Sequence, residues 1–143
     1  MTDKKDNNII GLDIFDTVSA SNKGSVLHFC KPGTDEEFFN GDTPLTVHVL
    51  GIESDAYTAH VAKQERADKN EDKKSRNDPL RDVKRDVALY CAIVTGWTGF
   101  PNPEKTGMLK FSKAALEEVL MSHADLRHQL RNFLLNRKNF ING

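Results

Sequence analysis

Hydrophobic and polar positions alternate in the first third of the chain, within residues 26–52. The clearest case is the run that contains Leu45, Val47 and Val49, which fall on one side of an extended chain while polar residues and Leu50 fall on the other. Turn residues separate the shorter apolar runs before it, among them the Asn-Gly dipeptide at 40–41, which favours tight hairpin turns. The pattern predicts a small antiparallel β-meander.

The pattern changes to a charged segment at residues 54–78. Ser54 can cap a helix that begins at Asp55, but apolar positions disappear after Val61. Charges of both signs recur at spacings of three and four, which suits a solvated helical arm. A mobile linker remains the alternative, because no apolar face anchors the segment.

Helical periodicity is strongest after residue 78. Asp78 and Pro79 suit a helix start, since Asp accepts bonds from free amides and Pro fits the first helical position. Apolar residues then recur at steps of three and four: Leu80, Val83, Val87, Tyr90, Val94 and Trp97. Gly96, Gly99 and the prolines beyond them are expected to stop this helix.

Two further helices are predicted near the carboxyl end. Ser112 can cap a helix over 113–121, and Ser122 with Asp125 three residues later fits the reciprocal capping pattern for the last one. The last helix carries apolar residues along one side: Leu126, Leu130, Phe133, Leu134, Phe140 and Ile141.

The expected fold class is therefore α+β and mainly α. A small antiparallel β-meander at the amino-terminal side is followed by a charged helix and a carboxy-terminal helical bundle. We expect one domain over residues 1–143, with a β-rich part at 1–53, a charged helix or linker at 54–78 and a helical part at 79–143.

Composition narrows the functional classes. The chain has 20 Lys and Arg against 21 Asp and Glu, so it is not a generally cationic nucleic-acid binder. The basic clusters at 73–76 and 81–85 are interleaved with aspartates and indicate a solvated face. Two widely spaced cysteines, Cys30 and Cys91, favour a reducing compartment. The polar amino terminus at 1–8 does not resemble a signal peptide, and no apolar run is long enough for a membrane span.

One segment invites an enzymatic interpretation. The residues from Asp13 to Thr17 resemble the nucleophile motif of haloacid-dehalogenase-type phosphatases, with Asp13 as nucleophile and Thr17 as phosphate contact. Phe15 stands where that family places its general acid/base aspartate, and the strand–helix alternation of such enzymes is missing from the pattern. We instead expect Leu12, Ile14 and Phe15 to pack on the sheet.

Metal and phosphate sites find little support. His28 and Cys30 lack a second ligand pair, and His123 and His128 do not share a helical face. The glycines around Trp97 lack the residues of a phosphate-binding loop. We therefore expect no catalytic residue, no metal and no cofactor.

A wider pattern spans the second half of the chain. Gly96-Trp97 ends a helix, a proline-containing loop leads to the apolar-Phe-Ser helix start at 109–112, and later helices carry Leu116, Leu120, Leu126, Gln129 and Phe133 before a close with Arg137 and Phe140. This order resembles the tail assembly chaperones of long-tailed bacteriophages. The segment 51–57 also resembles that family's turn and charged helix, so the likeness covers most of the chain from about residue 15.

The resemblance implies a noncatalytic protein of the host cytoplasm that binds the tape measure protein, keeps it soluble during tail tube assembly and leaves before the virion matures. The tail tube protein is a further partner to consider, as is self-association. An apolar helix face can hold an amphipathic partner helix in a groove. The candidate partner-binding residues are Trp97, Phe100, Phe111, Leu130, Phe133, Leu134, Phe140 and Ile141, with Phe140 and Ile141 expected to be the most exposed.

Two other functions stay open. The first is a phage or prophage structural protein that is retained in the virion, such as a tail or head completion subunit. The second is the phosphatase-like enzyme that would use Asp13 as its nucleophile.

Overall fold

A three-stranded antiparallel sheet lies at the centre of the computed structural model, which describes residues 11–141. Strand β5 (Thr46–Val49) is its middle strand and pairs with β2 (Ser25–His28) on one side and β6 (Val94–Thr98) on the other. The alternation predicted for β5 is confirmed, because Leu45, Val47 and Val49 are all buried.

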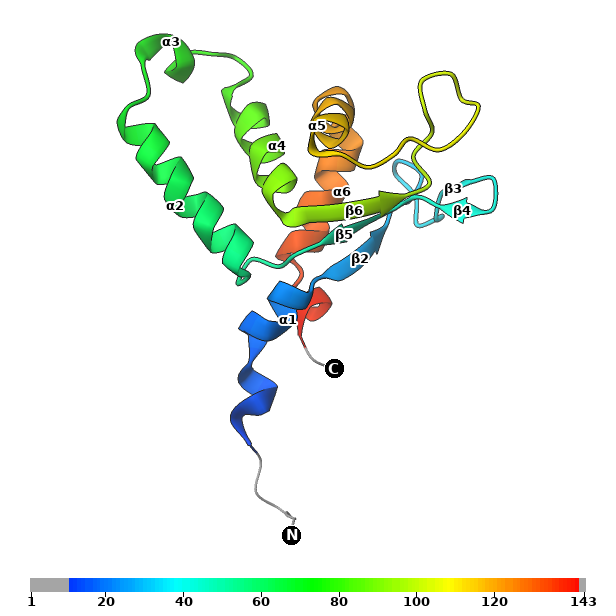
Figure 1. Ribbon diagram of the computed structural model, residues 1–143, viewed down its shortest axis with the longest axis horizontal. Coiled ribbons are helices and arrows are strands. Elements are labelled where there is room, and N and C mark those ends of the chain that lie inside the picture. The colour runs from blue at the N-terminus through cyan, green and yellow to red at the C-terminus, as the bar shows by residue number, and fades with distance from the viewer. Residues whose placement is uncertain (1–10, 142–143) are drawn as a thin grey trace.

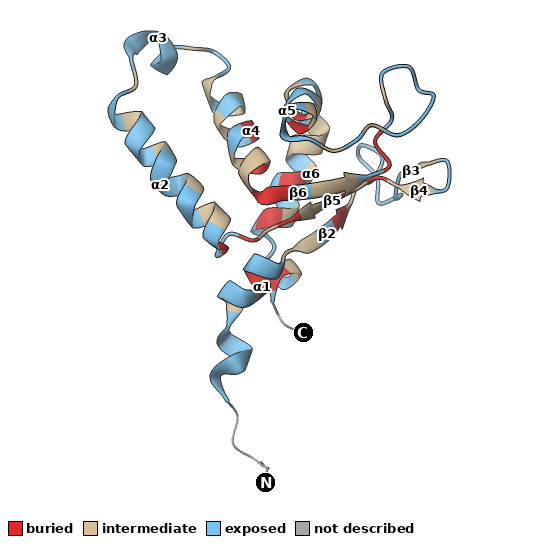
Figure 2. Ribbon diagram, viewed as in Figure 1, coloured by how far each residue is buried: buried red, intermediate tan, exposed pale blue. Residues whose placement is uncertain are grey.

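Three helices cover one face of this sheet (Figure 1). They are α4 (Arg81–Ile93), α5 (Lys113–Ser122) and α6 (Ala124–Leu135). Figure 2 shows the buried residues concentrated where the sheet meets these helices. The core formed there includes Val47, Ile93, Leu116, Leu120 and Leu130.

The α+β fold class is confirmed, with an amino-terminal sheet followed by helices. The predicted helix to Trp97 is wrong at its end, because α4 stops at Ile93 and the next residues form β6. Residues of β6 pair with β5, with Val47 opposite Trp97. This distant pairing, aided by the β-branched residues and the glycine in β6, overrides the helical spacing. Helix α4 also begins later than predicted, with Leu80 rather than Asp78 at its cap.

The charged segment is helical, which decides between the two alternatives for residues 54–78. Helix α2 (Asp55–Lys69) begins as predicted, with the Ser54 hydroxyl accepting the Tyr57 amide at 3.2 Å. A short helix, α3 (Lys73–Arg76), connects it towards α4. Some of its charged side chains form ion pairs with α4 and are not simply exposed to solvent.

Paired ions join the end of α2 to the start of α4. The Arg85 guanidinium donates to both carboxylate oxygens of Asp68, at 2.5 and 3.0 Å. Arg81 donates to both oxygens of Glu71, at 2.9 and 2.8 Å. Bidentate geometry of this kind strengthens a charged pair, and all four side chains here are partly buried. These ion pairs therefore connect α2 to α4, and α2 itself buries no residue.

These ion pairs predict a loss of stability in acid. Hydrogen bonds from Arg85, and then from Gln64, lower the pKa of Asp68 to about 2. Because this folded-state pKa lies below the unfolded value, the stabilisation is present above about pH 4 and is lost as the pH falls through about 2. Urea unfolding at about pH 5 and about pH 2 should show a smaller pH dependence for Asp68→Asn than for the wild type. Asp86→Asn, at an exposed carboxylate on α4 outside these ion pairs, is the matched control and should keep the wild-type dependence.

The two predicted helix caps near the carboxyl end have different outcomes. Ser112 caps α5 as predicted, by accepting the Ala115 amide at 3.0 Å. The predicted Ser122 cap is wrong, because Ser122 is the last residue of α5 and His123 precedes α6 without a side-chain cap bond. The capping position falls on His123, one residue later than predicted, and the His123 ring nitrogen Nδ1 lies 2.7 Å from the Val119 carbonyl oxygen instead of capping α6.

The amino-terminal residues do not pack as expected. A short 3₁₀ helix, η1 (Leu12–Phe15), and helix α1 (Thr17–Lys23) precede β2. Leu12, Ile14 and Phe15 are exposed rather than packed on the sheet, because η1 extends beyond the body of the molecule (Figure 1). The polar terminus at 1–8 lies outside the described residues.

Candidate binding groove

A predominantly apolar groove of about 620 Å³ lies at one end of the molecule, beside the β3–β4 hairpin. Strands β3 (Phe39–Asn40) and β4 (Thr43–Pro44) turn at Gly41, as the Asn-Gly dipeptide predicted. The groove runs between the segment that leads into this hairpin, the loop after β6 and the corner between α5 and α6. Its lining residues are Cys30, Lys31, Pro32, Phe38, Leu45, Phe100, Pro101, Val119, His123, Ala124, Asp125 and Leu126.

Stacked aromatic rings support the floor of the groove. Phe100 is buried and stacks on Trp97, with ring centroids 4.3 Å apart, while its edge meets Phe29 at 6.1 Å. Phe111 packs edge-on against Trp97 as well, with ring centroids 5.3 Å apart. The Trp97 indole N–H donates to the Leu109 carbonyl at 2.8 Å, so the ring is fixed at its polar end as well. The rings below the groove therefore hold one another in place.

One glutamine fixes the width of the groove. The Gln129 side chain on α6 accepts the Cys30 amide at 2.9 Å and donates to the Cys30 carbonyl, also at 2.9 Å. The side-chain nitrogen of Gln129 also donates to the Asp125 carboxylate at 2.7 Å. The Gln129 side chain thus bonds both backbone groups of Cys30, as a residue of a neighbouring strand would. These bonds connect α6 to the segment that leads into the hairpin. Gln129 occurs in the sequence pattern, but its role depends on a residue 99 positions away.

A second depression continues the groove past the hairpin. It measures about 630 Å³ and shares Phe38 and Pro101 with the first part. Met108, about half exposed, adds a flexible apolar side chain to its wall. The Asn40 side chain donates to the Gly99 carbonyl at 3.0 Å and joins the hairpin to the loop. The two depressions are thus neighbours, and both are open to solvent rather than closed cavities.

The candidate partner-binding residues separate into three groups. Phe100 lines the groove, and Trp97 and Phe111 lie behind it as supports. The residues from the last helix and its extension lie elsewhere: Leu130, Phe133, Leu134, Phe140 and Ile141.

Phe140 was expected to be exposed, and this is wrong. Its side chain is only 5% exposed and packs edge-on against Phe133, because the 3₁₀ helix η2 (Arg137–Phe140) turns the chain back onto the core. Ile141 is 45% exposed, as predicted. Leu130 is fully buried and Leu134 nearly so, which makes both core residues.

Sequence reasoning missed most of the groove. Pro32, Phe38 and Met108 lie in loops or at a hairpin, where no periodicity identifies a shared face. The one available signal was the number of large apolar residues in segments rich in turn formers, since such residues must either pack or stay exposed.

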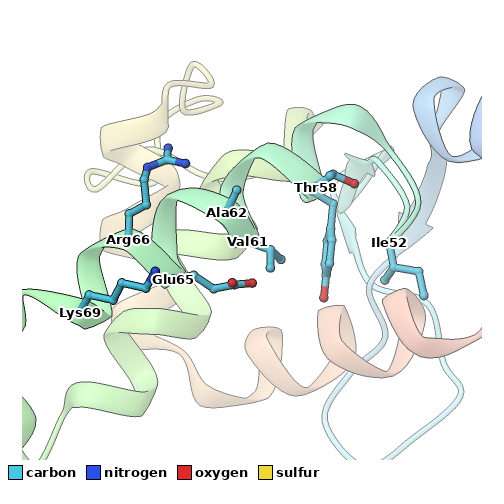
Figure 3. Close-up of a pocket in the computed structure, with 8 residues that line it drawn as sticks. Ile52, Thr58, Val61, Ala62, Glu65, Arg66 and Lys69 are labelled. Carbon is cyan, nitrogen blue, oxygen red and sulfur yellow. The ribbon is translucent and has the colours of Figure 1, made fainter.

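Another surface depression lies along α2 (Figure 3). It measures about 500 Å³ and joins apolar residues near the start of the helix, including Ile52, Val61 and Ala62, to charged residues further along, including Arg66 and Lys69. It has no convergent polar set that would fix a small ligand.

The geometry gives no support to chemistry at Asp13. That residue lies on η1, whereas the phosphatase motif needs an aspartate at the end of a strand in a parallel sheet, and the central sheet is antiparallel. Among residues 11–141, no three His, Cys, Asp or Glu side chains lie close enough together to hold a metal ion. Within the same residues, no helix has the length and apolar character needed to cross a membrane.

The two cysteines differ in their surroundings. Cys30 lines the groove and is half-buried, whereas Cys91 lies on α4 with its thiol directed at the Lys113 carbonyl. Burial, and then the charge of Glu117, raises the pKa of the Cys91 thiol. Its reactive thiolate form is therefore scarce near neutral pH.

Comparison with protein-family models, with curated proteins and with solved structures finds no match for this chain.

Proposed function

We propose that this protein is a noncatalytic tail assembly chaperone that holds an apolar helix of the tape measure protein in the groove. The observation that carries the proposal is the groove itself, whose walls are chiefly apolar and which shares Phe38 and Pro101 with the neighbouring depression. The order of motifs in the second half of the chain, which resembles the chaperone family, supplies the identity of the partner.

The construction of the groove suits a helical ligand. An amphipathic helix places apolar residues along one side at steps of three and four, and an elongated apolar surface can cover such a stripe. Affinity then comes from buried area, which demands little of the partner's sequence. The charged side chains of Lys31 and Asp125 lie among the lining residues and can meet the polar side of the helix.

Charged substitutions in the groove are expected to break the complex. The Phe38→Glu Met108→Glu double variant places two carboxylates on apolar walls, and both parent side chains are more than a third exposed, so the fold should survive. We expect co-purification with the tape measure protein to fall at least about tenfold, and its solubility on co-expression to fall with it. The measurement is recovery of soluble complex from co-expressing cells.

Phe39→Glu is the matched control. Phe39 follows Phe38 in the chain and begins β3, but it packs on the His28 ring instead of lining the groove. It should leave the complex intact. Equal recovery for the double variant and the wild type would contradict the proposed site, and no complex with wild-type protein would contradict the proposed function. Detection of the chain in purified virions would then favour a structural tail or head protein.

Protection of Cys30 gives an independent measurement of occupancy. In a Cys91→Ala background, a thiol reagent should modify Cys30 at a lower rate once the tape measure protein is bound, because the partner helix would cover the groove. Labelling at an unchanged rate within a stable complex would place the partner on another surface.

A further inference from the structure

The depression along α2 is apolar at one end and cationic at the other. Ile52 and Val61, on the apolar side, are 37% and 38% exposed. Arg66 and Lys69 follow roughly one to two turns beyond Val61. Figure 3 shows Ile52 at one end of the lining and Lys69 at the other. Apolar and charged contacts are thus offered in a fixed order along a single helix.

The fold separates charges that alternate in sign along the sequence of the charged segment. The carboxylates of Asp68, Glu71 and Asp78 all bond to cations near the start of α4. Arg66 and Lys69 form no ion pair with any residue in the range 11–141. The acids are therefore used inside the molecule, and these two cations remain available to a ligand in the depression.

One carboxylate qualifies this positive charge. Glu65 is exposed and is the one acid among the residues that line the depression, against the two cations Arg66 and Lys69. It lies between Val61 and Arg66 in the sequence, so it stands where the apolar part gives way to the cationic part. The complementary ligand is therefore one whose negative charge is confined to the cationic end.

This pattern favours a protein segment over other anions. The depression is open to solvent and has no convergent polar set for a small molecule. Nucleic acid carries a phosphate at every nucleotide and would place charge over the apolar end. A lipid surface is broad, whereas the pattern here follows one helix. A protein helix can change from apolar to acidic within about 18 Å, which is the length of α2 from Tyr57 to Lys69.

We propose that the depression along α2 binds a protein segment in which apolar residues are followed by acidic ones. The apolar part covers Ile52 and Val61, and the acidic part meets Arg66 and Lys69. Helix α2 buries none of its own residues, so the partner covers surface that the rest of the chain leaves accessible. The depression and the groove share no lining residue, so this inference goes beyond the proposed function and does not depend on it.

Two synthetic helical peptides test the charge preference. The first has leucines at steps of three and four in its first half and glutamates in its second half, and the other has lysines in place of the glutamates. Each is labelled and titrated with the full chain at low salt, and fluorescence anisotropy is measured. We expect the glutamate peptide to bind roughly tenfold more tightly than the lysine peptide. Equal affinities would overturn the proposal.

Substitutions at the cationic end should change the affinity in both directions. The Arg66→Gln Lys69→Gln variant removes both charges and should weaken the glutamate peptide by roughly tenfold. Glu65→Gln removes the opposing charge and should strengthen its binding by about twofold to threefold. The matched control is Arg131→Gln Lys138→Gln, which removes the same residue types from exposed positions outside the depression and should leave the affinity unchanged. Circular dichroism checks that every variant keeps the wild-type helix content.

Three further results would contradict the inference. A glutamate peptide with serines in place of its leucines that bound as tightly as the original would show that the apolar end contributes nothing. Duplex DNA that bound more tightly than the peptide, and lost binding in Arg66→Gln Lys69→Gln, would identify a nucleic-acid site. Loss of the peptide in the Phe38→Glu Met108→Glu variant would place it in the groove. A chain that binds the peptide but not the tape measure protein would remove the proposed function alone.

Discussion

Leu130→Ala is expected to destabilise the protein by about 2–5 kcal/mol, because it leaves a cavity where α6 packs in the core. Leu130 has no exposed surface and belongs to the same apolar cluster as Val87, Ile93 and Leu116. Domains of this size are stable by only about 5–15 kcal/mol, so the loss is a large fraction of the total. Urea unfolding followed by circular dichroism measures it.

Leu135→Ala provides the matched comparison on the same helix. Leu135 is 61% exposed, so the same truncation there should change stability by no more than about 0.5 kcal/mol. The pair also separates two roles for Leu130, which sequence analysis treated as a candidate for partner binding. A Leu130→Ala protein with wild-type stability and lost partner binding would contradict its assignment to the core.

Local patterns predicted the fold well where they depend on neighbouring residues. The alternation in β5, the Ser54 and Ser112 caps and the Asn-Gly turn each depend on a few consecutive residues, and all are present. The end of α4 could not be predicted in this way. Val94 and Trp97 fit the helical stripe, but their pairing with a strand some fifty residues earlier decides the conformation.

The candidate site was less accessible to sequence reasoning. The sequence pattern predicts partner contacts at Phe100, Trp97 and Phe111, and the structure places Phe100 on the groove and the other two behind it. The opposite wall comes from Pro32 and Phe38, which are brought there by the bonds of Gln129 to a distant backbone. No periodicity encodes such a contact. Apolar surface in loops can be recognised from sequence, but its assembly into one groove requires the tertiary structure.

Gly99→Ala is expected to cost about 3 kcal/mol and to disturb the groove as well. Gly99 has a φ of +81°, a conformation that costs a residue with a side chain about 1–2 kcal/mol. An added Cβ would also lie 2.5 Å from the Pro44 carbonyl oxygen, and relieving that contact requires a shift of backbone. Because Phe100 follows directly, the shift should alter its stacking on Trp97, the only tryptophan in the chain. Urea unfolding and tryptophan fluorescence measure the two effects.

Gly33→Ala separates the two causes. Gly33 has a similar φ of +74°, but an added Cβ would meet no atom within 4 Å. It should therefore show only the conformational cost of about 1–2 kcal/mol, with unchanged tryptophan fluorescence. If the two variants lost equal stability, the close approach between the loop and Pro44 would not be what requires glycine at position 99. If Gly99→Ala lost stability but still bound the tape measure protein as tightly as the wild type, the fixed position of Phe100 would not matter for the groove.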